Sequence, residues 1–326
     1  MIQATAREMD IKMTVDVIIP TYKPSDTLCL LLQKLQEQTF LIHRVLILNT
    51  EEALWEEAVK KYPIEAALKK LPHEIYHIRK DEFDHGGTRL FGAEQSSADI
   101  LLFMTQDAVP ANAFLVEELV QGLRDADTAV AYARQLPRED CSVVESYTRQ
   151  FNYPEQSRKK GMEDIATLGI KTFFCSDVCA AYKRNVFECL GGFETPVIFN
   201  EDMFFAAKAI DAGYYVYYAA RAEVIHSHNY TMAQQFHRNF DLAVSQQQHP
   251  EIFEQVSSEA EGMKLVLGTV KHLIAVGKPH LIFQLGFQCI GKYAGYRMGK
   301  HYKRLSRKQI LRYTMNQDYW TGIWKD

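Results

Sequence analysis

The 326-residue sequence predicts an α/β fold, with a doubly wound, mostly parallel sheet of the Rossmann-like type and a C-terminal helical extension. Short apolar runs typical of strands alternate with helix-like periodicity through the first half of the chain, and polar loops follow these runs. Beyond residue 230 only helical patterns remain. In open sheets of this kind ligands bind over the carboxyl ends of the strands, so we expect the functional residues in those loops.

The composition is that of a folded globular chain. Hydrophobic residues make up 47% and charged residues 24% of the sequence, which excludes a disordered chain and a polytopic membrane protein. The six cysteines follow no disulfide or zinc-ligand spacing, and residues 1–13 lack the apolar core of a signal peptide. We therefore expect a cytoplasmic location.

The first elements predict a β-α-β unit. Residues 15–19 are a β-branched run that ends at Pro20, and residues 44–48 are a second apolar run. Between them we expect a helix capped by Ser25 or Asp26, with apolar positions at helical spacing: Leu28, Leu31, Leu32 and Leu35. Two strands joined by a helix in this way are parallel.

The alternation continues along the chain. We expect helices near 51–61, 88–97, 114–123 and 201–213, and strands at 74–78, 100–104, 214–219 and 224–225. Residues 134–161 are polar and lack clear periodicity, which predicts a mobile segment bordering a site.

A carboxylate follows the most apolar of these strands. Asp107 lies in the loop Thr105-Gln106-Asp107-Ala108, where a carboxylate is costly unless it meets solvent, a cation or a hydrogen-bond donor. This placement favours a ligand-binding role. The alternative is a cap for the helix that follows.

A glycine-rich segment precedes the helix expected at 88–97. In Asp84-His85-Gly86-Gly87-Thr88-Arg89, backbone amides and a guanidinium could approach phosphate oxygens. The alternative is a glycine-rich turn with a surface arginine.

Two acids and two histidines stand near the end of the α/β part. Glu201 and Asp202 begin a helix, where acidic side chains usually serve only to stabilise the helix dipole. The turn at 191–193 before them favours a functional site instead. His226 and His228 share one face of an extended segment. One of them could bind a metal with Asp107, and the alternative is a structural pair.

Six segments occur in a characteristic order: Asp16-Val-Ile-Ile-Pro-Thr-Tyr-Lys-Pro24, His85-Gly-Gly-Thr-Arg89, Thr105-Gln-Asp-Ala108, Gly191-Gly-Phe193, Asn200-Glu-Asp202 and His226-Ser-His228. In this order they resemble the family 2 glycosyltransferases with a GT-A fold. Within that family the sequence looks most like bacterial dTDP-rhamnose rhamnosyltransferases of surface polysaccharide synthesis. The resemblance covers about residues 15–230.

The resemblance implies a donor site built from several loops. Thr21, Tyr22 and Asn49 would hold the nucleoside, and Arg89 would face the nucleotide diphosphate. Gln106 would also belong to the donor site.

It also implies a metal, Mg²⁺ or Mn²⁺, bound by Asp107 and His226. Asp107 matches the last position of the family's Asp-x-Asp motif, whereas Thr105 replaces its first Asp. The ion would then rely on diphosphate oxygens and a histidine, and whether the reaction requires it stays open.

Asp202 matches the second residue of the family's Glu-Asp motif and would be the catalytic base. Glu201, Asp177 and His228 would contact the acceptor or support the site from behind. The implied reaction is inverting transfer of L-rhamnose from dTDP-β-L-rhamnose to a hydroxyl of a lipid-linked glycan, giving an α-L-rhamnoside. The alternatives are a UDP-hexose donor and an inactive scaffold subunit that binds a nucleotide sugar.

The C-terminal region differs from the rest in charge. Residues 262–317 contain 11 basic and no acidic side chains, whereas residues 1–261 carry 25 basic and 39 acidic ones. We expect a GT-A nucleotide-sugar-binding domain at 1–230 and a basic, mainly helical region at 231–326.

The basic region favours an anionic membrane surface as its partner, which would place the protein peripherally on the inner face of the cell membrane. Its longest uncharged run, residues 279–291, has 13 residues and is too short to span a bilayer. The alternative is a homo-oligomerisation or packing module. Nucleic acid is not expected as a partner, because no base-reading motif accompanies the charge.

Overall fold

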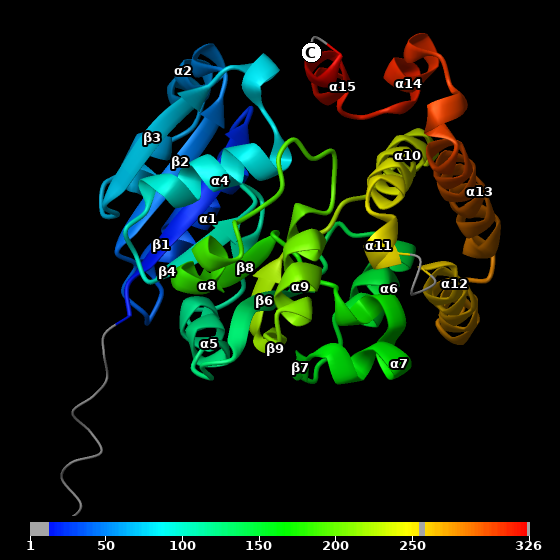
Figure 1. Cartoon of the computed structure of the whole chain (residues 1–326), viewed down its shortest axis with the longest axis horizontal. Helices are drawn as coiled ribbons and strands as arrows, with labels where there is room; N and C mark the ends of the chain where they lie inside the picture. The colour runs from blue at the N-terminus through cyan, green and yellow to red at the C-terminus, as the bar shows by residue number, and fades with distance from the viewer. Residues whose placement is uncertain (1–12, 254–257, 325–326) are drawn as a thin grey trace, which may run out of the picture.

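The computed structural model describes residues 13–253 and 258–324. Within these residues the molecule is built around one nine-stranded sheet in the order β3-β2-β1-β4-β8-β6-β9-β5, with β7 paired to β9 (Figure 1). The α/β class, the doubly wound sheet and the C-terminal helical extension predicted from the sequence are confirmed.

The N-terminal half of the sheet is parallel, as predicted. Its strands are β1 (Val15–Tyr22), β2 (Arg44–Thr50), β3 (His73–Ile78) and β4 (Ile100–Met104). The register pairs Thr21 of β1 with Asn49 of β2. The carboxyl ends of these strands therefore lie at one edge of the sheet.

Helices cover both faces of this half. On one face lie α1 (Asp26–Gln36), α2 (Glu52–Lys61), α3 (Ile64–Leu68) and α5 (Leu115–Gly122). On the other lie α4 (His85–Gln95), α8 (Arg184–Cys189) and α9 (Glu201–Asp211). Successive residues of β1 point to opposite faces, so Val17 and Ile19 join the first core and Ile18 joins the second.

The other half of the sheet is mixed. β8 (Cys179–Lys183) runs antiparallel between β4 and β6 (Thr128–Leu136), and β9 (Tyr215–Ile225) runs parallel to β6. The short strands β5 (Val109–Pro110) and β7 (Arg158–Lys160) are antiparallel to β9. The sequence did not predict β8, because Cys-Ala-Ala-Tyr-Lys contains no β-branched residue. The runs expected at 214–219 and 224–225 are one strand, with a register shift opposite Ala133 and Arg134.

Residues 134–161, in which the sequence shows no clear periodicity, contain a helix, and the mobility expected of this segment stays a prediction. Residues Val143–Asn152 form α6, and Oγ of Ser142 caps it by accepting a hydrogen bond from the backbone N–H of Glu145 at 3.2 Å. The helix packs against α12 (Ser258–Ala275), where the ring of Tyr147 stacks on His272 with centroids 4.7 Å apart. Its apolar partner is distant in sequence, so local periodicity does not reveal it. A short helix, α7 (Ile165–Leu168), follows β7.

α4 begins at His85, three residues before the start predicted from the sequence. Gly86 and Gly87 therefore lie in the first helical turn, where Oδ1 of Asp84 accepts a hydrogen bond from the Gly87 N–H at 2.6 Å. A Cβ atom at Gly86 would lie 2.0 Å from the backbone oxygen of Glu194. The glycine at position 86 is thus required by close packing against the chain that precedes α9.

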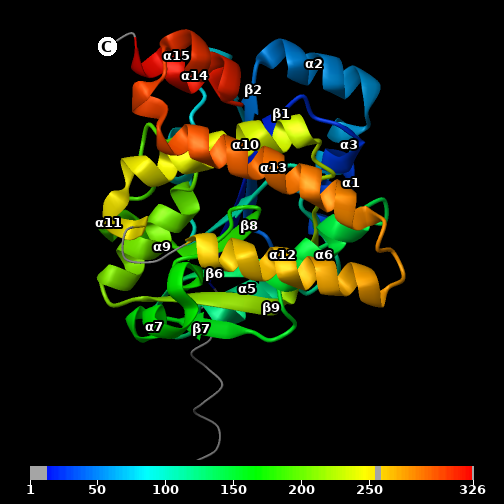
Figure 2. The same ribbon diagram turned by 90° about the vertical axis from the view of Figure 1, so that its right-hand side faces the viewer.

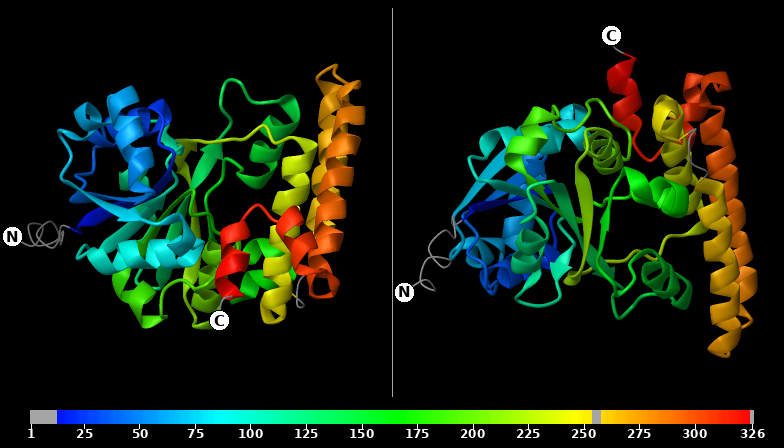
Figure 3. Two further views of the ribbon diagram at one scale, coloured as in Figure 1. Left: turned by 90° about the horizontal axis from the view of Figure 1, so that it is seen from above. Right: turned by 60° about the horizontal axis from the view of Figure 1, so that its bottom comes forward.

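The described chain beyond residue 230 is helical, as predicted. Its helices are α10 (Met232–Gln248), α11 (Pro250–Phe253), α12, α13 (Leu281–Lys300), α14 (Arg307–Tyr313) and α15 (Gln317–Ile323). Figure 2 shows α10 and α13 side by side, and both views in Figure 3 place α12 and α13 on the outer side of the molecule. None of the helices in the described ranges is long and apolar enough to cross a membrane.

α13 packs on α10 through glycines at every fourth position. Gly291, Gly295 and Gly299 face the backbone of α10, and a Cβ atom at Gly295 would lie 2.1 Å from the backbone oxygen of Phe236. Only glycine permits this approach. The two helices run in the same direction, because Gly291 meets Met232 and Gly299 meets Phe240.

The last helix returns to the N-terminal half. Lys80, just after β3, pairs with Asp318 of α15, with Nζ and Oδ2 3.3 Å apart. Trp320 of α15 shares an apolar cluster with Phe240 and with Ile198, which precedes α9. The C-terminal helices therefore pack directly against the chain that leads into α9.

Candidate functional site

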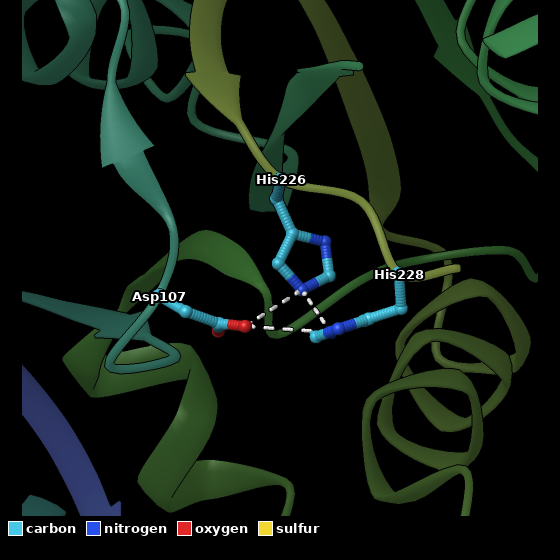
Figure 4. A group of neighbouring side chains, drawn as sticks. All are labelled: Asp107, His226 and His228. Atoms are coloured by element: carbon cyan, nitrogen blue, oxygen red, sulfur yellow. Dashed lines mark hydrogen bonds and ion pairs between the residues drawn. The ribbon is translucent and has the colours of Figure 1, made fainter. Parts of the chain in front are cut away.

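One carboxylate and two imidazoles converge beyond the ends of β4 and β9 (Figure 4). Oδ2 of Asp107 lies 3.3 Å from Nε2 of His228 and 3.7 Å from Nε2 of His226. The two Nε2 atoms are 3.0 Å apart, and all three ligand atoms lie within 4.8 Å of one another. The alternative of Asp107 as a helix cap is excluded, because β5 separates it from α5 and Phe114 stands at the N-cap.

A buried glutamine orients the first histidine. Nδ1 of His226 lies 3.0 Å from Oε1 of Gln135, an acceptor, so Nδ1 carries the proton and Nε2 keeps its lone pair. The guanidinium of Arg149 also donates to this Oε1 atom. The Gln135 amide in turn donates to the Tyr153 hydroxyl at 2.6 Å and the Ser176 hydroxyl at 2.9 Å. Hydrogen bonds therefore fix both the oxygen and the nitrogen of the Gln135 amide.

The chemistry of this donor set fits a divalent metal ion. Burial lowers the pKa of His226 and of His228, which favours the neutral imidazole that binds a metal. Asp107 is 29% and His228 38% exposed, which leaves the cluster open on one side. The structure thus brings His228 into the cluster alongside the predicted pair of Asp107 and His226.

The loop that carries Asp107 is fixed to the end of β1. The Gln106 side chain donates to the backbone oxygen of Tyr22 at 2.9 Å and accepts from the Tyr22 N–H at 3.2 Å. The backbone N–H of Thr105 donates a hydrogen bond to the backbone oxygen of Val178 at 3.1 Å. Gln106 therefore holds two loops in register, and the Tyr22 ring, 40% exposed, lies at their surface.

The other residues expected at the nucleoside are buried in the sheet. Asn49 is fully buried, and its Oδ1 accepts a hydrogen bond from the Thr21 hydroxyl at 3.2 Å. Its Nδ2 donates to the backbone oxygen of Glu51 at 3.0 Å. These pairings connect the ends of β1 and β2. A direct contact from Thr21 or Asn49 to the nucleoside stays a prediction.

Arg89 lies in a buried acidic cluster, so the surface-arginine alternative is excluded. The side chain is 6% exposed, and its Nη1 atom lies 3.0 Å from Oε1 of Glu201. Its Nε atom lies 3.5 Å from Oδ2 of Asp177. Both nitrogens therefore face carboxylates, and a contact from Arg89 to the diphosphate stays a prediction.

Asp177 is nearly inaccessible, and its two carboxyl oxygens face different partners. Its Oδ1 atom accepts a hydrogen bond from the Tyr182 hydroxyl at 2.6 Å, and Arg89 faces its other oxygen. Burial raises the pKa of Asp177 well above its usual range. A contact from Asp177 to the acceptor or a supporting role stays a prediction.

Asp202 lies at the start of α9, beside this cluster. Its Oδ2 atom accepts a hydrogen bond from the Asp177 N–H at 3.1 Å, and its Oδ1 from the Met203 N–H at 2.7 Å. Burial and the charge of Glu201 raise the pKa of Asp202. A carboxylate whose pKa is raised toward neutrality is suited to accept a proton.

Hydrogen bonds connect the Asp107–His226–His228 cluster to the segment that contacts Asp202. Gln135 contacts both His226 and Ser176, and the residue after Ser176 donates its N–H to Asp202. Sequence reasoning missed Gln135, Tyr182 and Arg149. Gln135 lies in the segment 134–161, which lacks clear periodicity. It is a single polar residue in β6 and belongs to no recognisable motif.

Comparison with known proteins identifies related chains. The family described as Glycosyl transferase family 2 matches residues 16–191. The O-antigen chain rhamnosyltransferase RfbN of Salmonella typhimurium is 36% identical over 313 residues, which cover 95% of this chain and 97% of that protein. The O-antigen chain rhamnosyltransferase WbaN of Salmonella anatum is 39% identical over 255 residues, covering 77% and 80%.

Two solved structures share the fold at low sequence identity. A mannosyltransferase of Pyrobaculum calidifontis, solved with GDP-Man and Mn²⁺, is 16% identical, with a TM-score of 0.57 over 96% of this chain and 88% of that chain. TarS 1-349 of S. aureus is 13% identical, with a TM-score of 0.51 over 90% of this chain and 91% of that chain. The GT-A type of sheet expected from the sequence is confirmed.

Proposed function

The chain belongs to glycosyl transferase family 2, and from this premise we propose that it is a rhamnosyltransferase of surface polysaccharide synthesis. The proposal is supported by 36% identity to an O-antigen chain rhamnosyltransferase over 95% of the chain. The donor we infer is dTDP-β-L-rhamnose and the acceptor is a hydroxyl of a lipid-linked glycan. Attack from the face opposite the leaving nucleotide gives an α-L-rhamnoside.

We assign the metal site to Asp107, His226 and His228, and the observation that carries the proposal is the convergence of these three ligands. Mn²⁺ suits two imidazoles and one carboxylate better than Mg²⁺, which prefers oxygen ligands. When bound, the ion would offset the charge that develops on the leaving diphosphate. The exposed side of the cluster leaves room for phosphate oxygens.

We assign the catalytic base to Asp202. An acceptor hydroxyl must lose its proton as it attacks the anomeric carbon, and no covalent sugar–enzyme intermediate is needed. The two backbone N–H groups that contact Asp202 hold its carboxylate in place. The Tyr22 ring is available to stack on the base of the donor, beside the loop held by Gln106.

A donor panel tests the proposal. The purified protein is incubated with Mn²⁺ and dTDP-, UDP- or GDP-sugars, and release of the free nucleotide is measured. We expect cleavage of dTDP-β-L-rhamnose, loss of that cleavage with EDTA and its recovery with Mn²⁺. Preferred cleavage of a UDP-hexose would show that the donor is not dTDP-β-L-rhamnose. If no nucleotide sugar is cleaved, the result would favour an inactive scaffold subunit.

We also propose that residues 1–230 form the catalytic unit and that residues 231–326 hold it on the inner, anionic face of the cell membrane. Large apolar side chains are exposed on α12 and α13: Met263, Leu267, Ile274, Phe283, Ile290 and Tyr293. Phe283 is 79% exposed. They stand among the basic side chains of the region without acids, a combination typical of helices that lie on anionic bilayers.

Flotation of the full chain with vesicles tests this assignment. Wild-type protein should float with phosphatidylglycerol-containing vesicles and not with neutral ones. Phe283→Glu should abolish flotation, whereas Leu41→Glu, at a residue 72% exposed between α1 and β2, should not. If the wild type stays unbound and instead sediments as a dimer that Phe283→Glu dissociates, the face is a homo-oligomer interface.

A further inference from the structure

A groove of about 510 Å³ lies beside His228, between α6 and α13. One wall comes from α6 and includes Thr148. The other comes from α13, and the chain from His228 to Met232 and Gln235 of α10 complete the lining. One ligand of the candidate metal site thus belongs to the groove as well.

The groove exists because α13 extends beyond the start of α10. Gly291 is the first of the glycines that pack on α10, and it meets Met232, the first residue of that helix. Gln284 and Gln288 continue the same face of α13 toward its N-terminus, since residues three or four apart lie on one side of a helix. Both line the groove instead of a helix interface.

Four polar side chains that line this groove form no side-chain hydrogen bond or ion pair with the described residues. Gln235 is 8% exposed, and no described residue forms a hydrogen bond with its amide. The same holds for Gln284 and Gln288, and the Lys292 ammonium has no ion-pair partner among the described residues. Gln284 is exposed, and Gln288 and Lys292 are half-buried. These side chains are therefore open to solvent in the groove and available to bind a polar ligand there.

The chemistry of the lining narrows the ligand class. Side-chain amides both donate and accept, which matches the adjacent hydroxyl groups of a sugar. The Phe287 and Tyr230 rings lie at the same groove and offer apolar faces to a pyranose ring. Gln284 to Lys292 spans about 12 Å along the helix axis at 1.5 Å per residue, longer than one sugar ring.

We propose that this groove is the acceptor site and that it binds the sugar residues of the glycan whose hydroxyl is glycosylated. The inference rests on the proposed glycosyltransferase function and assigns the acceptor to residues that no motif marks. It places the acceptor against α13 and the donor at the carboxyl ends of β1, β2 and β4. His228 lies where the two meet.

The test separates acceptor binding from donor chemistry. The double variant Gln284→Ala, Gln288→Ala is compared with wild type and with Gln33→Ala, which removes an exposed glutamine from α1. Two reactions are measured with dTDP-β-L-rhamnose and Mn²⁺: hydrolysis of the donor by water, and transfer to a panel of octyl β-D-galactoside, β-D-glucoside and α-D-mannoside. Donor hydrolysis also reports whether each variant is folded.

We expect the double variant to raise the KM for the accepted glycoside about tenfold or more, since two hydrogen bonds are lost. Its donor hydrolysis and donor KM should match wild type, and Gln33→Ala should match wild type in both reactions. An unchanged acceptor KM would overturn the assignment, as would a wild type that hydrolyses the donor but glycosylates none of the panel. A wild type that fails to hydrolyse any donor would instead overturn the proposed function.

Discussion

Nδ1 of His226 lies 3.0 Å from Oε1 of Gln135, and this contact sets which imidazole nitrogen faces Asp107. Gln135 is 2% exposed and is itself held by Arg149, Tyr153 and Ser176. The orientation of a proposed metal ligand therefore depends on a residue outside the proposed metal site.

Gln135→Leu should weaken Mn²⁺ binding about 10- to 100-fold, because His226 loses the acceptor that fixes its tautomer. Isothermal titration with Mn²⁺ measures this change. Gln135→Glu retains an acceptor at the same position and should bind the ion more tightly than Gln135→Leu. Equal affinity in the wild type and Gln135→Leu would show that the contact has no orienting role.

Asp202→Asn should lower the rate of sugar transfer by about 10²- to 10⁴-fold, the usual effect of removing a general base. Donor affinity, measured by titration with dTDP-rhamnose, should remain that of the wild type, because the amide keeps the shape of the side chain. Parallel loss of donor affinity would indicate that Asp202 shapes the start of α9 and does not take the proton.

Sugar transfer should rise with pH up to about 7 and then level off. Burial and the charge of Glu201 raise the pKa of Asp202 to about 7, and only the deprotonated carboxylate above that pH can accept a proton. The measurement is kcat/KM for the acceptor between pH 5.5 and 8.5 at saturating donor. A level profile across this range would contradict the assignment of Asp202 as the base.

Arg89→Leu should destabilise the fold by about 3–5 kcal/mol, because Glu201 would remain as a buried carboxylate without its cation. Urea unfolding gives the change in free energy. Arg79→Leu is the matched control: this arginine is 69% exposed and its ion pair with Asp81 contributes little. Similar small losses for both variants would mean that solvent reaches the Arg89 cluster.

Gly295→Ala should destabilise the packing of α13 on α10 by about 1–3 kcal/mol or more, because the added Cβ would meet the Phe236 carbonyl. Gly286→Ala, on the same helix, has nothing within 4 Å of the added atom. It should stabilise the helix by about 0.5–1 kcal/mol. Urea unfolding of both variants distinguishes packing from helix propensity.

Local patterns determined much of the α/β part. The apolar run at 100–104 became β4 with the same bounds, and the leucines of α1 form one face of the core, as their spacing required. Asp107 was selected because it follows the most apolar strand, and His226 and His228 because they share one face of an extended segment. The assignment of Asp107 and His226 to a metal came from the family resemblance. Such features depend on neighbours within a few residues, which the sequence displays directly.

The sequence by itself determined the fold class, the family motifs, the position of Asp202 at a helix start and the helical nature of residues beyond 230. The tertiary structure alone decided that Arg89 faces Glu201 and Asp177, that Gln135 orients His226, and that Gln284 and Gln288 line a groove. These contacts join segments far apart in the chain. Whether a buried charge contacts a carboxylate or a ligand depends on how helices and strands pack against one another. The spacing of residues along the chain does not reveal that packing.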